Sequence, residues 1–557
     1  GVIAYELLTG APPFTGRSAQ ALLAAHIVQR PADLCERRRD LPRELTRLVM
    51  SCLEKDPALR PQRAQAVLET LEAAAPDEFG LVGDRVMEAP PTIAVLPFSN
   101  LGGSTDDEYF SDGVTEDIIA QLSQISSLRV ISRTSVMRYK KTEKTTREIA
   151  GELGVSNIIE GSVRRVGNRL RIVAQLIDPA TEGHLWGETF DREMIDIFAI
   201  QSEVAERVAG VLRTRLTTDE QRRAARRPTD DVEAYNLFLL GRHHYNAITV
   251  DIGGFAKAGE YFQRAIERDP NFGRAYAWQA MVQLYFGGGY WGVRPRDAWA
   301  RGLSLAAKAL ELDGDISEAH MVLGQHADWI QYDWETARHH KETALRLSPN
   351  DTSAILPYAL LLAALGRFDE MVAATHRAVA LDPASIMARV NAIFICWASG
   401  VYDEALVHAR AARTWFVNDP GLPIWEAAVL VGLGRKTDAL PLVNGAVDAP
   451  LDNLHGLLAL AVLAACGDTA GAVSRLAPYH AREATEYVWP FGFAMCYSQL
   501  GDTDRALTYL ERAYEDRTGW VSLLATAPLF EGVRSNRRFN QILEWVNPPA
   551  ARMLAAR

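Results

Sequence analysis

The sequence predicts a mostly α-helical chain in three parts: an N-terminal helical segment, a small α/β domain and an α-solenoid. Five glycines, at positions 366, 400, 434, 467 and 501, recur at nearly constant intervals, as in a helical repeat. Residues 92–216 mix short apolar strands with amphipathic helices. At 557 residues the chain exceeds the roughly 250–300 residues at which a single core stops growing, so several domains are expected.

The N-terminal segment begins inside an apolar-periodic run at Gly1, with no capping residue before it. This pattern predicts a helix cut from a longer one. Residues 1–14, GVIAYELLTGAPPF, and residues 48–61, LVMSCLEKDPALRP, resemble the large helix and the end of the C-terminal lobe of serine/threonine protein kinases. The resemblance implies that residues 1–75 are a truncated kinase C-lobe of bacterial type. A generic helical domain is the alternative.

The resemblance also assigns a structural role to Arg60 and excludes catalysis by this chain. In the family, the arginine that matches Arg60 pairs with the glutamate of an Ala-Pro-Glu motif. That motif, His-Arg-Asp and Asp-Phe-Gly are all absent from the sequence. We therefore expect Arg60 to be unpaired or to take another partner. No catalytic, cofactor-binding or metal-binding residue is assigned, and ATP and Mg are expected only for the intact parent kinase.

Residues 76–91 are predicted to be a linker because Gly and Pro interrupt every period. The α/β domain follows over residues 92–216. Its expected strands are 92–98, 128–132, 158–166, 169–178 and 185–190, and its expected helices are 109–124, 146–153 and 195–216. Gly167 and Asn168 form a two-residue hairpin connection that needs positive φ.

Five blocks of the α/β domain resemble the TolB-like (FlgO-like) domain of bacterial signalling proteins. The blocks are IAVLPF at 93–98, YFSDGVTED at 109–117, EGSVR at 160–164, AQLID at 174–178 and GHLW at 183–186. The resemblance implies a fold placed between an N-terminal effector and a C-terminal repeat array, and it implies no catalytic activity. The same modules also occur fused to nucleotide-cyclase or winged-helix domains.

A second linker, residues 217–230, leads to a repeat solenoid over residues 231–546 with a C-terminal cap. The period of about 34 residues is typical of tetratricopeptide repeats, and seven or eight repeats are expected. Each helical hairpin exposes apolar faces that it cannot bury alone, so the stack is the folding unit.

Counting from the turn glycines places a set of apolar residues on the inner face of the solenoid. A solvated groove would carry charge there, so the pattern indicates a groove for a protein or peptide partner. Simple interhelix core is the alternative. The candidate groove consists of Leu360, Asn391, Phe394, Trp397, Trp425, Phe491 and Met495.

Other candidate sites have ordinary explanations. The loop 100–108 lacks a Gly-Lys-Ser/Thr motif, and its contiguous acids suit neither a nucleotide nor a cation, so a solvated turn is expected. The adjacent pairs His243-His244 and His339-His340 cannot face one metal from a helix. The arginines between 222 and 227 are explained by the end of a linker helix.

Composition limits the partners and the compartment. The formal net charge of −11 argues against nucleic-acid binding. The five cysteines form no Cys-x-x-Cys pair, which indicates reduced thiols and a cytoplasmic location. The apolar runs 354–365 and 456–466 fall short of the ~20 residues that span a bilayer. We therefore expect the regulatory and interaction part of a serine/threonine kinase. A non-catalytic scaffold or sensor with a vestigial kinase tail is the alternative.

Overall fold

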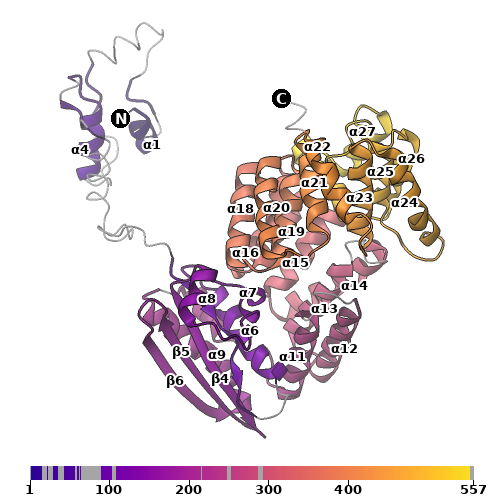
Figure 1. Ribbon diagram of the computed structural model, residues 1–557. Helices are drawn as coiled ribbons and strands as arrows, with labels where there is room; N and C mark the ends of the chain where they lie inside the picture. Colours follow the sequence, from indigo (N-terminus) through magenta and orange to yellow (C-terminus); the bar gives the residue numbers. More distant parts are fainter. Residues whose placement is uncertain are drawn as a thin grey trace. The chain divides into compact units, whose positions relative to one another are not determined.

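The computed structural model describes residues 2–9, 11–14, 22, 25, 29–34, 43–56, 59–61, 63, 90–102, 108–214, 216–246, 252–286 and 293–551. The chain divides into two compact units, Gly1–Ala89 and Pro90–Arg557 (Figure 1). The described residues are predominantly helical, with a small mixed sheet, which confirms the predicted fold class. Most of the linker predicted at residues 76–91 lies outside the described residues.

The first unit contains helices α1 (Val2–Thr9) and α4 (Arg43–Cys52). Tyr5 of α1 is buried, and its hydroxyl donates a hydrogen bond to the Ala32 carbonyl at 3.0 Å. Four of the buried side chains described in this unit, Tyr5, Leu34, Val49 and Leu53, form a small cluster.

The second unit opens with a six-stranded sheet. Its strands are β1 (Thr92–Val95), β2 (Ser99–Asn100), β3 (Arg129–Val130), β4 (Asn157–Val166), β5 (Arg169–Asp178) and β6 (Gly183–Glu193). The order is β3-β1-β4-β5-β6, and β2 pairs with the far half of β4. Strands β1 and β4 are parallel, whereas β4, β5 and β6 form an antiparallel meander. Gly167 has φ +60° in the hairpin connection, as its position predicts.

Side chains along β5 alternate between buried and accessible, which indicates that helices cover one face of the sheet. The helices of this domain are α6 (Glu108–Ser123), α7 (Arg133–Met137), α8 (Thr146–Leu153), α9 (Ile197–Val211) and α10 (Thr218–Ala224). Helix α8 has the bounds that the sequence predicts, and a capping box of Thr145 and Glu148 begins it. The segment predicted as the second linker contains α10, which also begins with a capping box.

The rest of the second unit is a solenoid of paired helices (Figure 1). In the described part, α11 to α26 form eight antiparallel hairpins, which confirms the expected repeat architecture. The first helices of the hairpins are α11 (Val232–Asn246), α13 (Gly273–Phe286), α15 (Ser317–His326), α17 (Thr352–Ala364), α19 (Ile386–Ala398), α21 (Leu422–Gly432), α23 (Asn453–Ala465) and α25 (Pro490–Gln499). The second helices are α12 (Ile252–Arg268), α14 (Pro295–Leu312), α16 (Trp334–Leu347), α18 (Phe368–Leu381), α20 (Tyr402–Trp415), α22 (Lys436–Ala446), α24 (Thr469–Arg482) and α26 (Thr503–Glu515).

The periodic glycines end the first helices of the last five hairpins. All five have positive φ, between 74° and 100°. After Gly366, for example, the Arg367 amide donates back to the Leu362 carbonyl at 2.9 Å, which closes a Schellman turn. Glycine is required there because it enters the left-handed region without the Cβ penalty.

Two irregular elements depart from the repeat. Helix α15 continues into a π-helical turn, η5 (Ala327–Gln331). After α26 the chain forms the short 3-10 helix η6 (Gly519–Leu523) and then the final helix α27 (Arg537–Val546). Helix η6 packs against η5 and α17, so it contacts repeats far from it in sequence.

Candidate functional site

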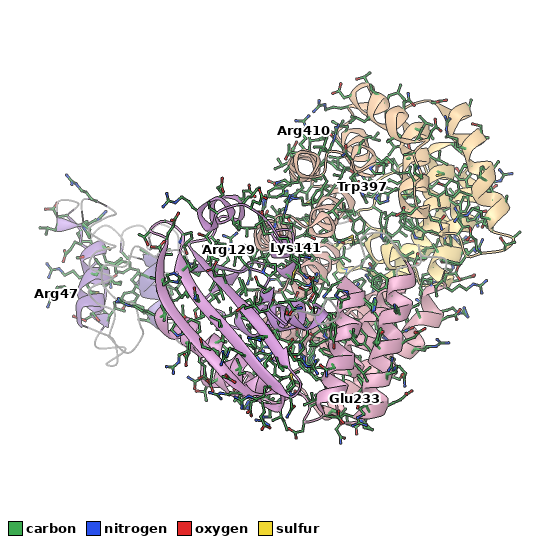
Figure 2. The ribbon with its side chains drawn as sticks, turned by 60° about the horizontal axis from the view of Figure 1, so that its bottom comes forward. Arg47, Arg129, Lys141, Glu233, Trp397 and Arg410 are labelled. Atoms are coloured by element: carbon green, nitrogen blue, oxygen red, sulfur yellow. The ribbon has the colours of Figure 1, made fainter. Side chains whose placement is uncertain are left out.

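Six of the seven residues predicted to line an open groove are buried in the solenoid. Asn391 differs: it is half-buried, and its amide donates to the Met387 carbonyl of its own helix at 2.8 Å. Trp397 lies among the helices (Figure 2), and its indole donates to the Ala428 carbonyl at 3.1 Å. The exposed fractions are 8% for Leu360, 7% for Phe394, 1% for Trp397, 1% for Trp425, 1% for Phe491 and 0% for Met495.

The side chain of Trp520, from η6, packs against these residues. Its ring stacks on Phe394 with the centroids 4.2 Å apart, and Trp489 meets it edge-on at 4.7 Å. The other aromatic rings around Trp520 are Phe491 at 5.9 Å, Trp397 at 6.2 Å and Trp425 at 6.3 Å. The prediction of an accessible groove at these residues is therefore wrong, because the C-terminal segment of the same chain fills it. Their role in binding a partner stays a prediction.

Arg60 lies in the first unit and is exposed. Its Nε donates to the Glu54 carbonyl at 2.8 Å, so the side chain takes a local partner. The structural role that the kinase resemblance assigns to Arg60 stays a prediction.

A buried charge network joins the α/β domain to the first repeats. Asp117 and Glu116, neighbours on α6, are 2% and 3% exposed. The Arg242 guanidinium of α11 donates to Asp117 at 2.6 Å and lies 2.9 Å from Glu116. Arg274 lies 3.6 Å from Asp117, and Arg133 pairs with Glu116. Buried carboxylates require such partners, since an unpaired ion is costly to desolvate.

Neutral groups complete the coordination of Asp117. The Tyr235 hydroxyl donates to Asp117 Oδ2 at 2.5 Å, and Gln201 donates to the same oxygen at 3.2 Å. Burial, together with the Asp117 carboxylate, raises the pKa of Tyr235 well above its ordinary value. Burial opposes the charge on Arg242, but Glu116 and Asp117 outweigh it and raise its pKa. The network therefore fixes α6 against α11.

The α/β domain also follows one edge of the solenoid, where the turns between successive hairpins meet it. Asn350, after α16, donates from Nδ2 to the carbonyls of Ser123, Ile125 and Leu128 at 3.4, 3.2 and 2.9 Å. One repeat further, Ser135 Oγ donates to Asp382 Oδ1 at 2.6 Å. Equivalent turns of successive repeats thus dock on one segment of the α/β domain.

Asp382 is 3% exposed at this edge, and burial raises its pKa to about 6, against the hydrogen bonds from Ser135, Ser132 and Ser385. The arginines that the sequence analysis assigned to a linker helix lie further along the same edge. Arg226 pairs with Asp313, and Arg222 lies 3.6 Å from Asp315. The basic run therefore makes ion pairs with the solenoid.

The remaining sequence candidates carry no chemistry in the described residues. His244 stacks on Tyr261 at 5.3 Å, and His340 Nδ1 lies 2.8 Å from His320 Nδ1. Across the residues with described placement, no group of three or more His, Cys, Asp or Glu side chains could hold a metal ion. Residues 103–107 of the acidic loop lie outside the described part. Among the helices with described residues, none has the length and apolar character for crossing a bilayer.

Sequence reasoning missed both the charge network and Trp520. Glu116 and Asp117 gave a signal, since two acids interrupt the apolar spacing of Val114, Ile118 and Ile119. For Trp520, the signal was Gly519-Trp520-Val521 in a segment that does not follow the 34-residue pattern.

Comparison with known proteins supports the repeat assignment. A tetratricopeptide repeat family model matches residues 491–515, which cover most of α25 and all of α26. A solved tetratricopeptide repeat protein of Thermus thermophilus aligns with 36% of this chain and 99% of its own, at 22% identity and a TM-score of 0.30. The matched hairpin of α25 and α26 is thus of tetratricopeptide type.

Two curated relatives are named as enzymes of different classes, a putative adenylate cyclase and a protein kinase. The chain is 39% identical over 248 residues to "Putative adenylate cyclase 3" of Rhizobium meliloti, a match covering 44% of this chain and 41% of that protein. It is 33% identical over 111 residues to the serine/threonine-protein kinase PknB of Mycolicibacterium smegmatis, covering 19% of this chain and 17% of PknB. The chain thus spans less than half the length of either relative. The 248-residue match is longer than the first unit, Gly1–Ala89, so it extends into the second.

Proposed function

We propose that this chain is the regulatory and interaction part of a serine/threonine protein kinase, and that its repeats bind protein partners. The observation that carries the proposal is the junction around Asp117, Glu116 and Arg242. This junction connects the α/β domain and the repeats, which belong to the same compact unit. A partner held by the repeats would act on this whole unit. The kinase-like residues belong to the other unit, where the effector would attach.

The kinase assignment rests on the sequence of the first unit and on partial matches to kinases. Residues 48–61 carry the Asp-Pro-x-x-Arg-Pro pattern, and PknB and two further bacterial kinases align with 13–19% of the chain. The whole kinase would use ATP and Mg to phosphorylate protein serine or threonine. We propose that this chain binds neither, because it lacks the residues that hold the phosphates and the metal. TolB-like character of the α/β domain is part of the same proposal.

A non-catalytic scaffold or sensor is the second candidate. The match to the putative adenylate cyclase keeps it open, because a match that covers more than twice as much of the chain as the match to PknB is to a protein not named as a kinase. The second unit would then serve different effectors, and a kinase-like first unit need not imply an active kinase.

One measurement tests the proposal for this chain, and a second separates the two candidates. Calorimetry on this chain should show no Mg-ATP binding, and micromolar binding would contradict the proposal. The longer natural protein should transfer the γ-phosphate of ATP to serine or threonine of a protein substrate. Absence of this transfer, with the protein folded and its Mg-ATP supplied, would favour the scaffold.

A further inference from the structure

The segment 516–530, here named the C-terminal plug, lies where the solenoid was expected to receive a partner. It follows α26, at the position where another repeat helix would begin, but it forms η6 and turns instead. The plug contacts the first helices of several hairpins through Phe394 of α19, Trp425 of α21 and Phe491 of α25. Such helices line the concave face in solenoids of this kind, so the plug occupies the face at which the sequence predicted a partner groove.

The chemistry of this contact is apolar and aromatic. Trp520 enters a box of five aromatic rings, and Val521, Leu523 and Leu524 are buried beside it. Aromatic packing of this type is favourable but only weakly directional, so another apolar segment with one large ring could make the same contacts.

The π-helical turn of the third repeat holds the start of the plug. Gly519 lies against Trp329 of η5 so closely that a Cβ at this glycine would be 2.4 Å from the indole. Arg517 lies over the rings of Tyr332 and Tyr514, at 5.0 and 4.7 Å. Lys341 and Asp328, both nearly inaccessible, pair beneath the turn. A π-helical turn inside an α-helical hairpin is rare and frequently marks a functional position.

Backbone strain brackets the plug. Arg517 has φ +59° and Leu529 has φ +69°, the left-handed region that side chains other than glycine rarely adopt. Arg517 takes this conformation in the turn that ends α26, where the Thr518 amide donates to the Ala513 carbonyl at 3.0 Å. The plug thus begins at the position that glycine occupies in the other repeat turns.

We propose that the C-terminal plug is an intramolecular ligand of the repeats, and that a protein partner with a short apolar segment carrying one aromatic side chain binds by displacing it. This inference rests on the proposed function, in which the repeats bind protein partners. The plug is then an autoinhibitory contact: it closes the partner site until a competing segment takes the place of Trp520.

Gly519→Val in the full chain is the test variant, because its side chain would collide with Trp329 and expel the plug without changing the aromatic box. Gly314→Val is the matched control, since a Cβ at Gly314 meets no atom within 4 Å. The probe is a fluorescein-labelled peptide of residues 514–530, measured by fluorescence anisotropy. We expect the peptide to bind Gly519→Val at least tenfold more tightly than it binds wild type or the control. A peptide with Ala in place of Trp520 should not bind.

Amide hydrogen exchange of the wild-type chain gives an independent measurement that needs no variant to fold. Plug amides should exchange at least tenfold faster than the amides of α21 and α25, because the plug opens while the repeats stay folded. Exchange of the plug at the same rate as these helices would show a fixed part of the core and overturn the proposal. Equal peptide affinity for Gly519→Val and wild type would overturn it as well.

Failure of the proposed function would look different. The plug would still exchange rapidly and the peptide would still bind Gly519→Val, but Gly519→Val in the longer natural protein would leave phosphoryl transfer unchanged. Failure of the plug proposal alone leaves partner binding on another face of the repeats intact.

Discussion

The second unit contains two internal interfaces that differ in chemistry: the junction of the α/β domain with the repeats is charged, and the contact of the C-terminal plug with the repeats is aromatic. At the junction, Asp117 and Arg242 meet at 2.6 Å with both side chains buried. At the plug, Trp520 packs among rings 4.2 to 6.3 Å away. A buried ion pair is directional and penalises any state that leaves one charge unpaired. Apolar packing is less directional, so one apolar segment can replace another in the same contacts. The charged junction therefore suits permanent attachment of the α/β domain, and the plug contact suits competition with a partner segment.

Trp397→Ala should give the largest effect on stability. The side chain is 1% exposed, and its loss leaves a cavity between α19 and α21 and removes the hydrogen bond to the Ala428 carbonyl. Truncation of a buried Trp costs about 3–5 kcal/mol in the free energy of unfolding. Urea denaturation measures this loss. Met387→Ala, an exposed position on the same helix, is the control and should change stability by less than about 0.5 kcal/mol.

A Trp397→Ala chain with unchanged stability and weakened partner capture would instead support a direct partner contact at Trp397. The aromatic contact with the plug would then not be the main role of Trp397.

Arg242→Ala tests the charged interface. It leaves Asp117 and Glu116 buried with fewer partners, and breaking such a pair costs about 3–5 kcal/mol. We expect a value near the lower end, about 3 kcal/mol, because Arg274 and Arg133 remain beside the two carboxylates. Chemical denaturation followed by far-UV circular dichroism measures it. Arg207→Ala removes a largely exposed arginine whose ion pair with Glu188 spans 3.5 Å, and it should cost less than about 1 kcal/mol. Equal losses in the two variants would mean that the network does not hold the junction.

The two interfaces also show what sequence patterns can reach. The glycine period predicted the repeat turns, and local signals predicted α8 and the Gly167 hairpin, because caps, turns and helix ends depend on neighbouring residues. The Asp117–Arg242 pair joins residues 125 positions apart, so no local pattern specifies it. The aromatic residues on the inner face were found by counting from the glycines. The burial of these residues could not be predicted in this way, because it depends on the packing of the segment that follows the last repeat.

The Asp382 carboxyl makes the junction sensitive to pH. Its pKa is raised to about 6 in the folded chain, above the ~3.9 of an unfolded one. Between these values the folded chain keeps its proton and the unfolded chain loses it, so stability falls as the pH rises from 4 to 6. Asp382→Asn does not titrate, yet its amide oxygen can accept from Ser135. Its stability relative to wild type should therefore rise by about 2–3 kcal/mol from pH 4 to pH 7.

Urea unfolding at pH 4, 5, 6 and 7 gives this difference directly. Asp403→Asn, at an exposed position on α20, is the control and should follow the wild-type profile. Parallel profiles for wild type and Asp382→Asn would show that the buried carboxyl does not couple pH to this edge of the junction.

Asn350→Ala should give the smallest of these effects, and it asks whether neutral hydrogen bonds at the junction matter beside the charges. The Asn350 amide reaches three backbone carbonyls of the α/β domain, of Ser123, Ile125 and Leu128. Its removal leaves buried acceptors without this donor, at a cost of about 1–2 kcal/mol in the free energy of unfolding. Asn391→Ala is the matched control, because that amide is half-buried and bonds only to Met387 in its own helix, so less than about 0.5 kcal/mol is expected. Hydrogen exchange should also quicken at residues 123–128 in Asn350→Ala alone. If both asparagine variants lose equally little stability, and exchange there is unchanged, the junction depends on its ion network and not on the docking of the repeat turns.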